Sequence, residues 1–260
     1  MGGFDADAAH SVAPGLSLDL LARLVDKSLI AVVENAGGRT RYRLLETMRK
    51  YTDELLVEAG ELDRARERHL RHFSALAGTF EARWPSSRAQ WFVNERADDY
   101  QNFRAALDWA AAVDPCRARP LLAGARDLFI LLGVADGRRL AQLLLDRCPA
   151  RDRERVDVQI LFGSLAMLAA DEEAARRALA EAQELSAELG EQALEGWAHF
   201  FLGLTESLVG GRIEPARDHL AAARALHAET GVRSGWARAT ANLGLTFLTS
   251  DPDRARELVE

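Results

Sequence analysis

The sequence predicts a mainly α-helical protein in which a helix, a β-hairpin and a further helix precede a superhelical array of paired helices. Two observations carry this prediction. Residues 29–44 hold a β-branched run and turn chemistry, whereas Ala, Leu, Glu and Arg favour helices over most of the remaining 260-residue chain, which has only seven Pro. A period of about 40 residues then marks stacked helical units in the second half.

The first elements resemble the tail of a winged helix. Residues 17–27 predict an amphipathic helix, because Leu residues recur at helical spacing behind a capping Ser17. Residues 29–33 and 39–44 read as two strands joined by the turn Asn35–Gly38. A further helix is expected from about Glu46 to Ala59, with Gly60 at its C-terminus. We assign residues 1–60 to a partial winged-helix domain.

Residues 61–115 are predicted to form a helical linker and a first repeat. The helical pattern of residues 62–77 stops at Trp84–Ser87, and a new helical stretch begins at Trp91–Asn94. That stretch continues through residues 102–109, and Asp114-Pro115 ends it.

Residues 116–260 are predicted to form tetratricopeptide-like helical repeats. Gly163, Gly203 and Gly244 recur at intervals of 40 and 41 residues, and an Ala-Arg pair recurs about a dozen residues after each. The expected helices are 118–132, 137–147, 153–169, 172–189, 192–209, 215–230 and 234–249.

Small residues in these helices predict close packing. A helical Gly costs up to about 1 kcal/mol against Ala, so tight contact between paired helices is the expected compensation. We expect Ala175, Ala216 and Ala255 to face the three glycines. The aromatic residues of this region are interpreted as core rather than as ligand-stacking residues; they are Trp197, Phe200, Phe201, Trp236 and Phe247.

Composition excludes several classes of protein. The formal net charge is −7, so no global field attracts nucleic acid or acidic lipid. Cys116 and Cys148 are too few for a zinc cluster or a disulfide framework, and we expect both to be small buried hydrophobes. The start has no signal-peptide pattern and no stretch is apolar enough to span a membrane, which predicts a cytoplasmic protein without membrane contact.

Several segments together resemble the region that follows the nucleotide-binding domain in bacterial signal-transduction ATPases of the NB-ARC (STAND) class. Most of these proteins are LuxR-family or AfsR-like transcriptional regulators. Beyond residue 120 the resemblance is to tetratricopeptide-like repeats in general. The segments that carry the family resemblance are Gly2–Asp5 with Ala8-Ala9, Leu20–Leu29, Tyr42–Tyr51, Arg66–Ala77 and Asp99–Trp109.

The resemblance implies that the winged helix packs on an ATPase module and that the repeats sense an inducer or a partner. This chain lacks that module: neither Lys27 nor Lys50 stands in the Gly-x-x-x-x-Gly-Lys-Ser/Thr pattern that cradles phosphate. Many relatives also place a His-Asp pair, whose His contacts ADP, where this chain has Leu45 and Glu46. We therefore expect no nucleotide ligand and no other cofactor.

Five basic residues are candidate contacts for DNA or for the ATPase module: Arg39, Arg41, Arg43, Arg49 and Lys50. The three hairpin arginines alternate along one strand, so they share a face. Such a wing can rest on DNA phosphates or on an acidic protein surface. We favour the alternative of a solvated hairpin edge, because the neighbouring helix offers few side chains suited to reading bases.

Other polar groups indicate no chemistry. His69 and His72 lack a third metal ligand and are expected at the surface. The adjacent carboxylates Asp98-Asp99 and Glu172-Glu173 point in different directions along a helix and are expected to be solvated. No nucleophile motif is present, so we expect neither a metal site nor an enzyme.

The favoured hypothesis is a regulatory and sensory fragment of a signal-transduction ATPase-type transcriptional regulator. Its repeats would bind a protein or small inducer on their concave face, with the ATPase module in cis or in trans. The alternative is a self-contained tetratricopeptide-like interaction scaffold without a transcriptional role. A third possibility is direct DNA binding through the wing.

Overall fold

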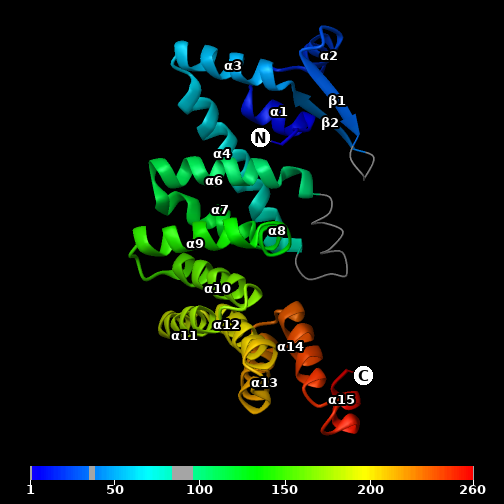
Figure 1. The fold of residues 1–260 in the computed structure, drawn as a ribbon, viewed down its shortest axis with the longest axis vertical. Helices are drawn as coiled ribbons and strands as arrows, with labels where there is room; N and C mark the ends of the chain where they lie inside the picture. The colour runs from blue at the N-terminus through cyan, green and yellow to red at the C-terminus, as the bar shows by residue number, and fades with distance from the viewer. Residues whose placement is uncertain (1, 35–38, 84–95, 260) are drawn as a thin grey trace.

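The structure is a computed structural model that describes residues 2–34, 39–83 and 96–259. It is 78% helical, and a two-stranded antiparallel hairpin precedes an elongated, repeat-like array of helices (Figure 1). The predicted fold class is confirmed. Among the described residues, no helix has the length and apolar character needed to cross a membrane.

One end of the molecule is formed by a small unit, here called the N-terminal unit. It consists of α1 (Ala6–Val12), α2 (Leu18–Asp26), β1 (Ile30–Glu34), β2 (Thr40–Leu44) and α3 (Glu46–Glu58). The predicted helix, hairpin and helix are confirmed, and Gly60 follows α3 with a left-handed φ of +67°. Helix α1 was not predicted. Asp5 caps it by accepting a hydrogen bond from the Ala8 amide at 2.8 Å.

The hairpin carries the small core of this unit. Its register pairs Ile30 with Leu44, and Phe4 forms an additional antiparallel bridge with Tyr42. Ala9, Leu21 and Ile30 are buried together, whereas α3 buries none of its side chains fully. The expected turn Asn35–Gly38 lies outside the described residues.

The N-terminal unit leads into α4 (Leu62–Arg83), η1 (Ala97–Asp99) and α6 (Tyr100–Val113). Helix α4 extends six residues beyond the predicted end at Ala77. Phe73 on α4 and Phe103 on α6 pack edge to face with ring centroids 5.0 Å apart, at the start of the main core. The expected break at Trp84–Ser87 and helix start at Trp91–Asn94 fall outside the described part of the chain.

The next segment differs from its prediction. One helix was expected over residues 118–132, but the chain forms the 3-10 turn η2 (Pro115–Ala118), α7 (Arg119–Gly124) and α8 (Arg126–Leu132). Ala125, between α7 and α8, has φ −87° and ψ 10°, which interrupts the helix. Gly124 packs so closely on α4 that a Cβ there would lie 2.9 Å from the Ala77 Cβ.

Cys116 and Cys148 form a disulfide, with Cα atoms 5.5 Å apart and a sequence separation of 32. Cys148 is buried as expected and Cys116 is half-buried, but the two residues are bonded rather than separate hydrophobes, which corrects the expectation. The bond forms because η2 packs against α9 (Val134–Arg147), which brings the residue after α9 beside the turn.

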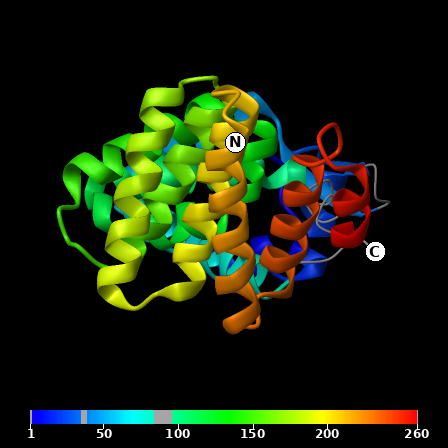
Figure 2. The same ribbon diagram turned by 90° about the horizontal axis from the view of Figure 1, so that it is seen from below.

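The remaining helices are paired. They are α10 (Arg153–Leu168), α11 (Glu172–Leu189), α12 (Gln192–Leu204) with the π-helical segment η3 (Thr205–Val209), α13 (Ile213–Glu229), α14 (Arg233–Leu245) and α15 (Pro252–Val259). Figure 2, a view along the long axis, shows α14 and α15 displaced to one side of α10 and α11, so the array turns as it extends. The five helices predicted over residues 153–249 are confirmed in order, whereas α15 was not predicted and α14 ends at Leu245, four residues before its expected end.

Gly163 and Gly203 do pack closely, and the side chain nearest to each is a Leu rather than the expected Ala, although the Ala216 carbonyl oxygen would lie 3.2 Å from a Cβ on Gly203. A Cβ on Gly163 would lie 2.5 Å from the Leu179 Cγ, and a Cβ on Gly203 would lie 2.7 Å from the Leu220 Cγ. Each Leu follows Ala175 or Ala216 by four residues, one helical turn. The side chain that faces each of these two glycines therefore lies one helical turn after the expected Ala. A larger side chain is needed there because it must reach across to fill the space that Gly leaves.

Candidate functional site: a cavity on the inner face

The array has a cavity on the face formed by α8, α10, α12 and α14, here called the inner face. These helices include the first member of each of the three C-terminal pairs, and α10 and α14 both pack against α12. The cavity measures about 580 Å³. Because it is shared by successive units, its shape depends on how those units stack.

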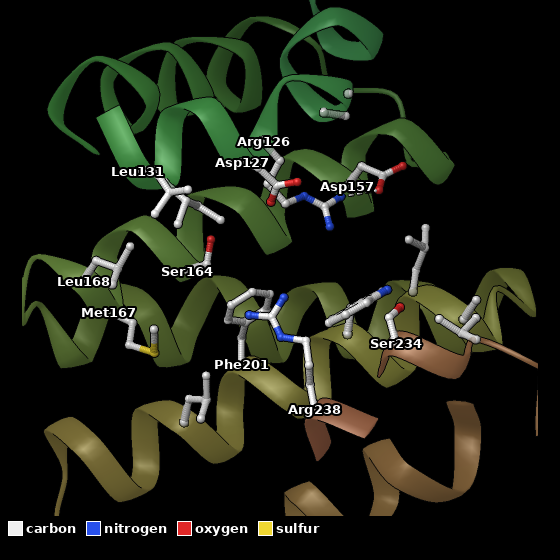
Figure 3. A pocket seen from close by; sticks show the side chains of 18 of the residues that line it. Arg126, Asp127, Leu131, Asp157, Ser164, Met167, Leu168, Phe201, Ser234 and Arg238 are labelled. Atoms are coloured by element: carbon white, nitrogen blue, oxygen red, sulfur yellow. Dashed lines mark hydrogen bonds and ion pairs between the residues drawn. The ribbon is translucent and has the colours of Figure 1, made fainter. Parts of the chain in front are cut away.

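One wall of the cavity is charged. Arg126 and Asp127 begin α8, and the Arg126 guanidinium donates to the buried Asp157 carboxylate of α10 at 3.1 Å. Figure 3 shows the three side chains gathered on this wall. Burial raises the pKa of Asp127 to about 6, against the opposing effect of Arg126 and Arg238. The pKa of Asp127 is therefore close enough to neutral pH for the carboxylate to take up a proton when its surroundings change.

The facing wall supplies a further cation. Arg238 of α14 reaches toward the cavity from the opposite side to Asp127 (Figure 3). Its guanidinium carbon lies 5.7 Å from the ring centroid of Trp197 and 5.2 Å from that of Phe200. Burial lowers the pKa of Arg238 below its usual range, while Asp127 acts in the other direction.

The other end of the cavity is apolar. Leu131, Met167 and Leu168 lie together at the end of the cavity away from the Arg126–Asp157 pair (Figure 3). Trp197 and Phe201 of α12 line the cavity as well. A charged end and an apolar end in one small cavity are typical of a site for an amphipathic molecule.

The aromatic prediction holds in part. Phe200 and Phe201 are buried, and Trp197 and Phe247 pack against the core. Trp236 is 42% exposed, so its assignment to the core is wrong. It lies on α14 one residue after Gly235, which turns toward the buried ring of His227, so Trp236 points elsewhere.

The cavity was not predicted from the sequence. Its charged residues come from helices far apart in the chain, and no motif joins them. One signal was available, because Arg126 and Asp127 stand directly before the apolar run Leu128–Leu132. Burying charged side chains beside such a run costs free energy unless each charge has a partner.

Of the five predicted contact residues, Arg41 is turned inward. It is 6% exposed, and its guanidinium donates to the Asp99 carboxylate at 2.6 Å and to the Gly3 carbonyl at 2.5 Å. Asn102 of α6 donates to the same carbonyl at 2.9 Å. Arg41 thus joins the hairpin to α6, and the expectation of a solvated or DNA-facing side chain is wrong for this residue.

The other four predicted residues lie nearer the surface. Arg39, Arg43 and Lys50 are exposed, and Arg49 is half-buried and pairs with Glu46 at 2.6 Å. The alternation along β2 places Arg43 on the side of Arg41, and Arg39 lies directly before the strand, but only Arg41 is covered. The five residues therefore do not form one continuous basic surface.

Two further expectations of solvated groups are corrected. Asp99 is 3% exposed, because it accepts from Arg41 and pairs with Arg96 at 3.3 Å. Glu172 is half-buried and pairs with Arg212, which also holds the buried Glu206. Both carboxylates serve packing between elements.

The histidines are also less exposed than expected. His69 and His72 are half-buried, and burial lowers the pKa of His69 to about 4. The two rings pack on Phe73, at centroid distances of 4.6 and 4.9 Å. Within residues 2–34, 39–83 and 96–259, no group of three or more His, Cys, Asp or Glu side chains could hold a metal ion.

A second cavity of about 770 Å³ separates parts of the N-terminal unit from the array. Helices α1, α3, α4 and α6 line it, and Arg43 and Arg49 stand among the lining residues. The N-terminal unit is therefore attached through Arg41 and through the packing of α1 on α4, whereas α3 makes few contacts with α4.

These features define a helical-repeat protein with a hairpin-containing unit at one end and a ligand-sized cavity in the array. Over 117 residues the chain is 41% identical to proteins of Mycobacterium bovis and Mycobacterium tuberculosis, each named "Putative HTH-type transcriptional regulator". That match covers 42% of this chain and 13% of theirs. An "Uncharacterized protein" of M. bovis is 42% identical over 78 residues, which covers 27% of this chain and 20% of that protein. No protein-family model matches the chain.

Proposed function

We propose that this chain is the sensory part of a transcriptional regulator and that it acts by binding rather than by catalysis. The inner-face cavity carries the proposal. An occupant would contact α8, α10, α12 and α14 at once, so it would favour the stacking of helices that fits it best. Binding would then shift the shape of the whole array.

The role in transcription is supported by the relatives named as regulators of transcription. The chain matches a small share of their length, so a DNA-binding region would belong to another part of the full protein. We place the chain between that region and an ATPase module of the NB-ARC class, as in LuxR-family regulators with tetratricopeptide-like repeats.

The relay would run through the contact between the N-terminal unit and α6. Arg41, Asp99 and Asn102 hold the hairpin at one point, while the second cavity leaves space beneath α3. A change in the array could therefore tilt the N-terminal unit about this fixed point. The exposed Arg39, Arg43 and Lys50 would meet the acidic surface of the ATPase module.

A cavity-filling substitution tests the proposal in the source organism. Leu168 lines the cavity and is 49% exposed, and Leu189 on α11 is 42% exposed but lies outside the lining. Chromosomal Leu168→Trp should change the same transcripts as deletion of the gene, whereas Leu189→Trp should not. RNA sequencing of the three strains and their parent gives the readout.

Two outcomes would contradict this function. If the deletion strain had the same transcripts as its parent, the chain would have no regulatory role, and the self-contained interaction scaffold would be favoured instead. Equal effects of the two Trp substitutions would show that the cavity is not where the signal is received.

A further inference from the structure

We propose that the inner-face cavity takes a small amphipathic carboxylate, a molecule with one carboxylate group on an apolar or aromatic body. The inference rests on the proposed function in that it names the occupant of the same cavity. It follows from the charges of the walls, from their separation and from the size of the cavity.

The charged lining favours an anion. Arg126 and Arg238 face the cavity from opposite walls, together with Asp127 and Asp157. Arg153 also lines the cavity, but it is exposed and pairs with Glu191 at 3.8 Å, outside the lining. Asp157 is already paired with Arg126 at 3.1 Å. Arginine keeps its proton at every physiological pH, so the cavity can lose negative charge by protonation but cannot lose positive charge.

Asp127 is the group in the cavity whose protonation state can change. A ligand carboxylate placed between Arg126 and Arg238 would compete with Asp127 for the same cations and would raise its pKa further. Asp127 would then take up a proton as the ligand binds. The charged groups that face this exchange are Arg126 beside it, Asp157 and Arg153 on α10, and Arg238 on α14.

The arrangement of the walls selects an amphipathic molecule with a single charge. Arg126 and Asp157 stand at one side, and Leu131, Met167 and Leu168 gather at the other end (Figure 3). The planar guanidinium of Arg238 matches the geometry of a carboxylate. Once Asp127 is protonated, Arg126, Arg238 and Asp157 leave one net positive charge at the cavity, and one ligand carboxylate balances it.

The size of the cavity favours a small molecule over a peptide. Its volume of about 580 Å³ lies within the range of about 300–1,000 Å³ that is typical of small-molecule sites. Trp197 and Phe201 offer apolar faces on which an aromatic body can pack.

Three probes with one body and different head groups test the class of ligand. They are 2-naphthoate, 2-naphthylmethanol and 2-naphthylmethylammonium, titrated into the full chain by isothermal titration calorimetry at pH 7.5. We expect 2-naphthoate to bind at least tenfold more tightly than the other two. At pH 6.0 its affinity should rise about tenfold, because more of Asp127 is then protonated before binding.

Matched variants place the effect at named residues. Arg238→Met should weaken 2-naphthoate binding at least tenfold and leave 2-naphthylmethanol within about twofold. Arg233→Met, an exposed residue of the same helix outside the lining, should leave both unchanged. Asp127→Asn should bind 2-naphthoate as tightly at pH 7.5 as at pH 6.0, and circular dichroism confirms that each variant is folded.

Tighter binding of the ammonium or of the alcohol would overturn the carboxylate and leave the cavity as a ligand site of another class. An equal loss of 2-naphthoate affinity in Arg238→Met and Arg233→Met would overturn the assignment of Arg238 as a contact of the ligand carboxylate. Failure of all three probes to bind would overturn the inference as a whole, whereas the transcript experiment decides the proposed function separately.

Discussion

At the scale of the residue, Arg41 joins the hairpin of the N-terminal unit to η1 and α6. Its side chain leaves the hairpin, enters a buried position beside η1 and α6, and meets Asp99 58 residues further along the chain. A buried charge depends on its partner, because neither water nor a distant counter-ion can replace it. Strand alternation predicted the face of β2 on which Arg41 lies, but no local pattern reveals what covers that face.

Replacing Arg41 tests this anchor. Arg41→Met leaves Asp99 buried with a weaker set of partners, so the free energy of unfolding should fall by about 3–5 kcal/mol. Arg43→Met, on the same strand but exposed, should change it by less than about 0.5 kcal/mol. Urea titration followed by circular dichroism measures both, and equal effects would mean that the pair does not hold the unit.

Buried imidazoles predict a dependence of stability on pH. Burial lowers the pKa values of His69, His199 and His227 to about 4, from about 6.5 in the unfolded chain. The unfolded state binds more protons between these values, so the stabilisation is complete above pH 6.5 and declines as the pH falls toward 4. Asp127, whose pKa is raised, opposes this trend in part.

The melting temperature should therefore fall steadily from pH 6.5 to pH 4. NMR isolates one contributor, since the His227 ring is fully buried between Gly196 and Gly235. Its signals should stay those of a neutral imidazole until about pH 4, while a peptide of residues 213–229 should titrate near pH 6.5. Titration of His227 near 6.5 in the folded protein would contradict the packing described here.

At the scale of the element, the array depends on glycines that let one helix approach the next. The period of the sequence predicted these positions because it is local and repeated. It could not tell which side chain fills each gap: Leu179 and Leu220 do so, one turn beyond the alanines that share the period. The break between α7 and α8 was likewise hidden, because the packing of Gly124 on Ala77 joins segments distant in sequence.

A pair of Gly→Ala substitutions tests the close packing. Gly163→Ala should lower the free energy of unfolding by about 1–3 kcal/mol, because its Cβ would collide with Leu179. Gly78→Ala, in α4 with open space around it, should raise stability by about 0.5–1 kcal/mol. Chemical denaturation measures the difference, and a gain from both substitutions would refute the tight contact.

The disulfide is a second element-scale feature. Its 32-residue loop closes η2, α7, α8 and α9 into one segment, which predicts a stabilisation of about 2–4 kcal/mol. Cys116→Ser with Cys148→Ser should lower the melting temperature by about 5–15 °C. Reductant should do the same to the natural chain and nothing to the double variant. A natural chain insensitive to reductant would show that the bond does not form.

At the scale of the whole molecule, the fold depends both on local sequence patterns and on contacts between helices far apart in the chain. The hairpin, the helix order and the repeats could be predicted from periodic patterns within short windows. The cavity could not, because Arg126, Asp157 and Arg238 come from three helices and meet only when the array turns. Arg39, Arg41 and Arg43 were predicted to share one face of the hairpin, and of these three only Arg41 is buried.

The same architecture links the two ends of the chain. The inner-face cavity is lined by α8, α10, α12 and α14. The N-terminal unit contacts the array through the buried Arg41–Asp99 pair and through the packing of α1 on α4, with the second cavity beside these contacts. A ligand that changes the stacking of the array would therefore change how firmly the hairpin is held.

Hydrogen–deuterium exchange with mass spectrometry measures that link directly. The full chain is compared with and without saturating 2-naphthoate, and Arg238→Met serves as the control. The account predicts changed exchange in β1 and β2 as well as in α8, α10, α12 and α14, with neither change in the control. Protection confined to the cavity helices, with an unaltered hairpin, would contradict the claim that this array passes a signal to its N-terminal unit.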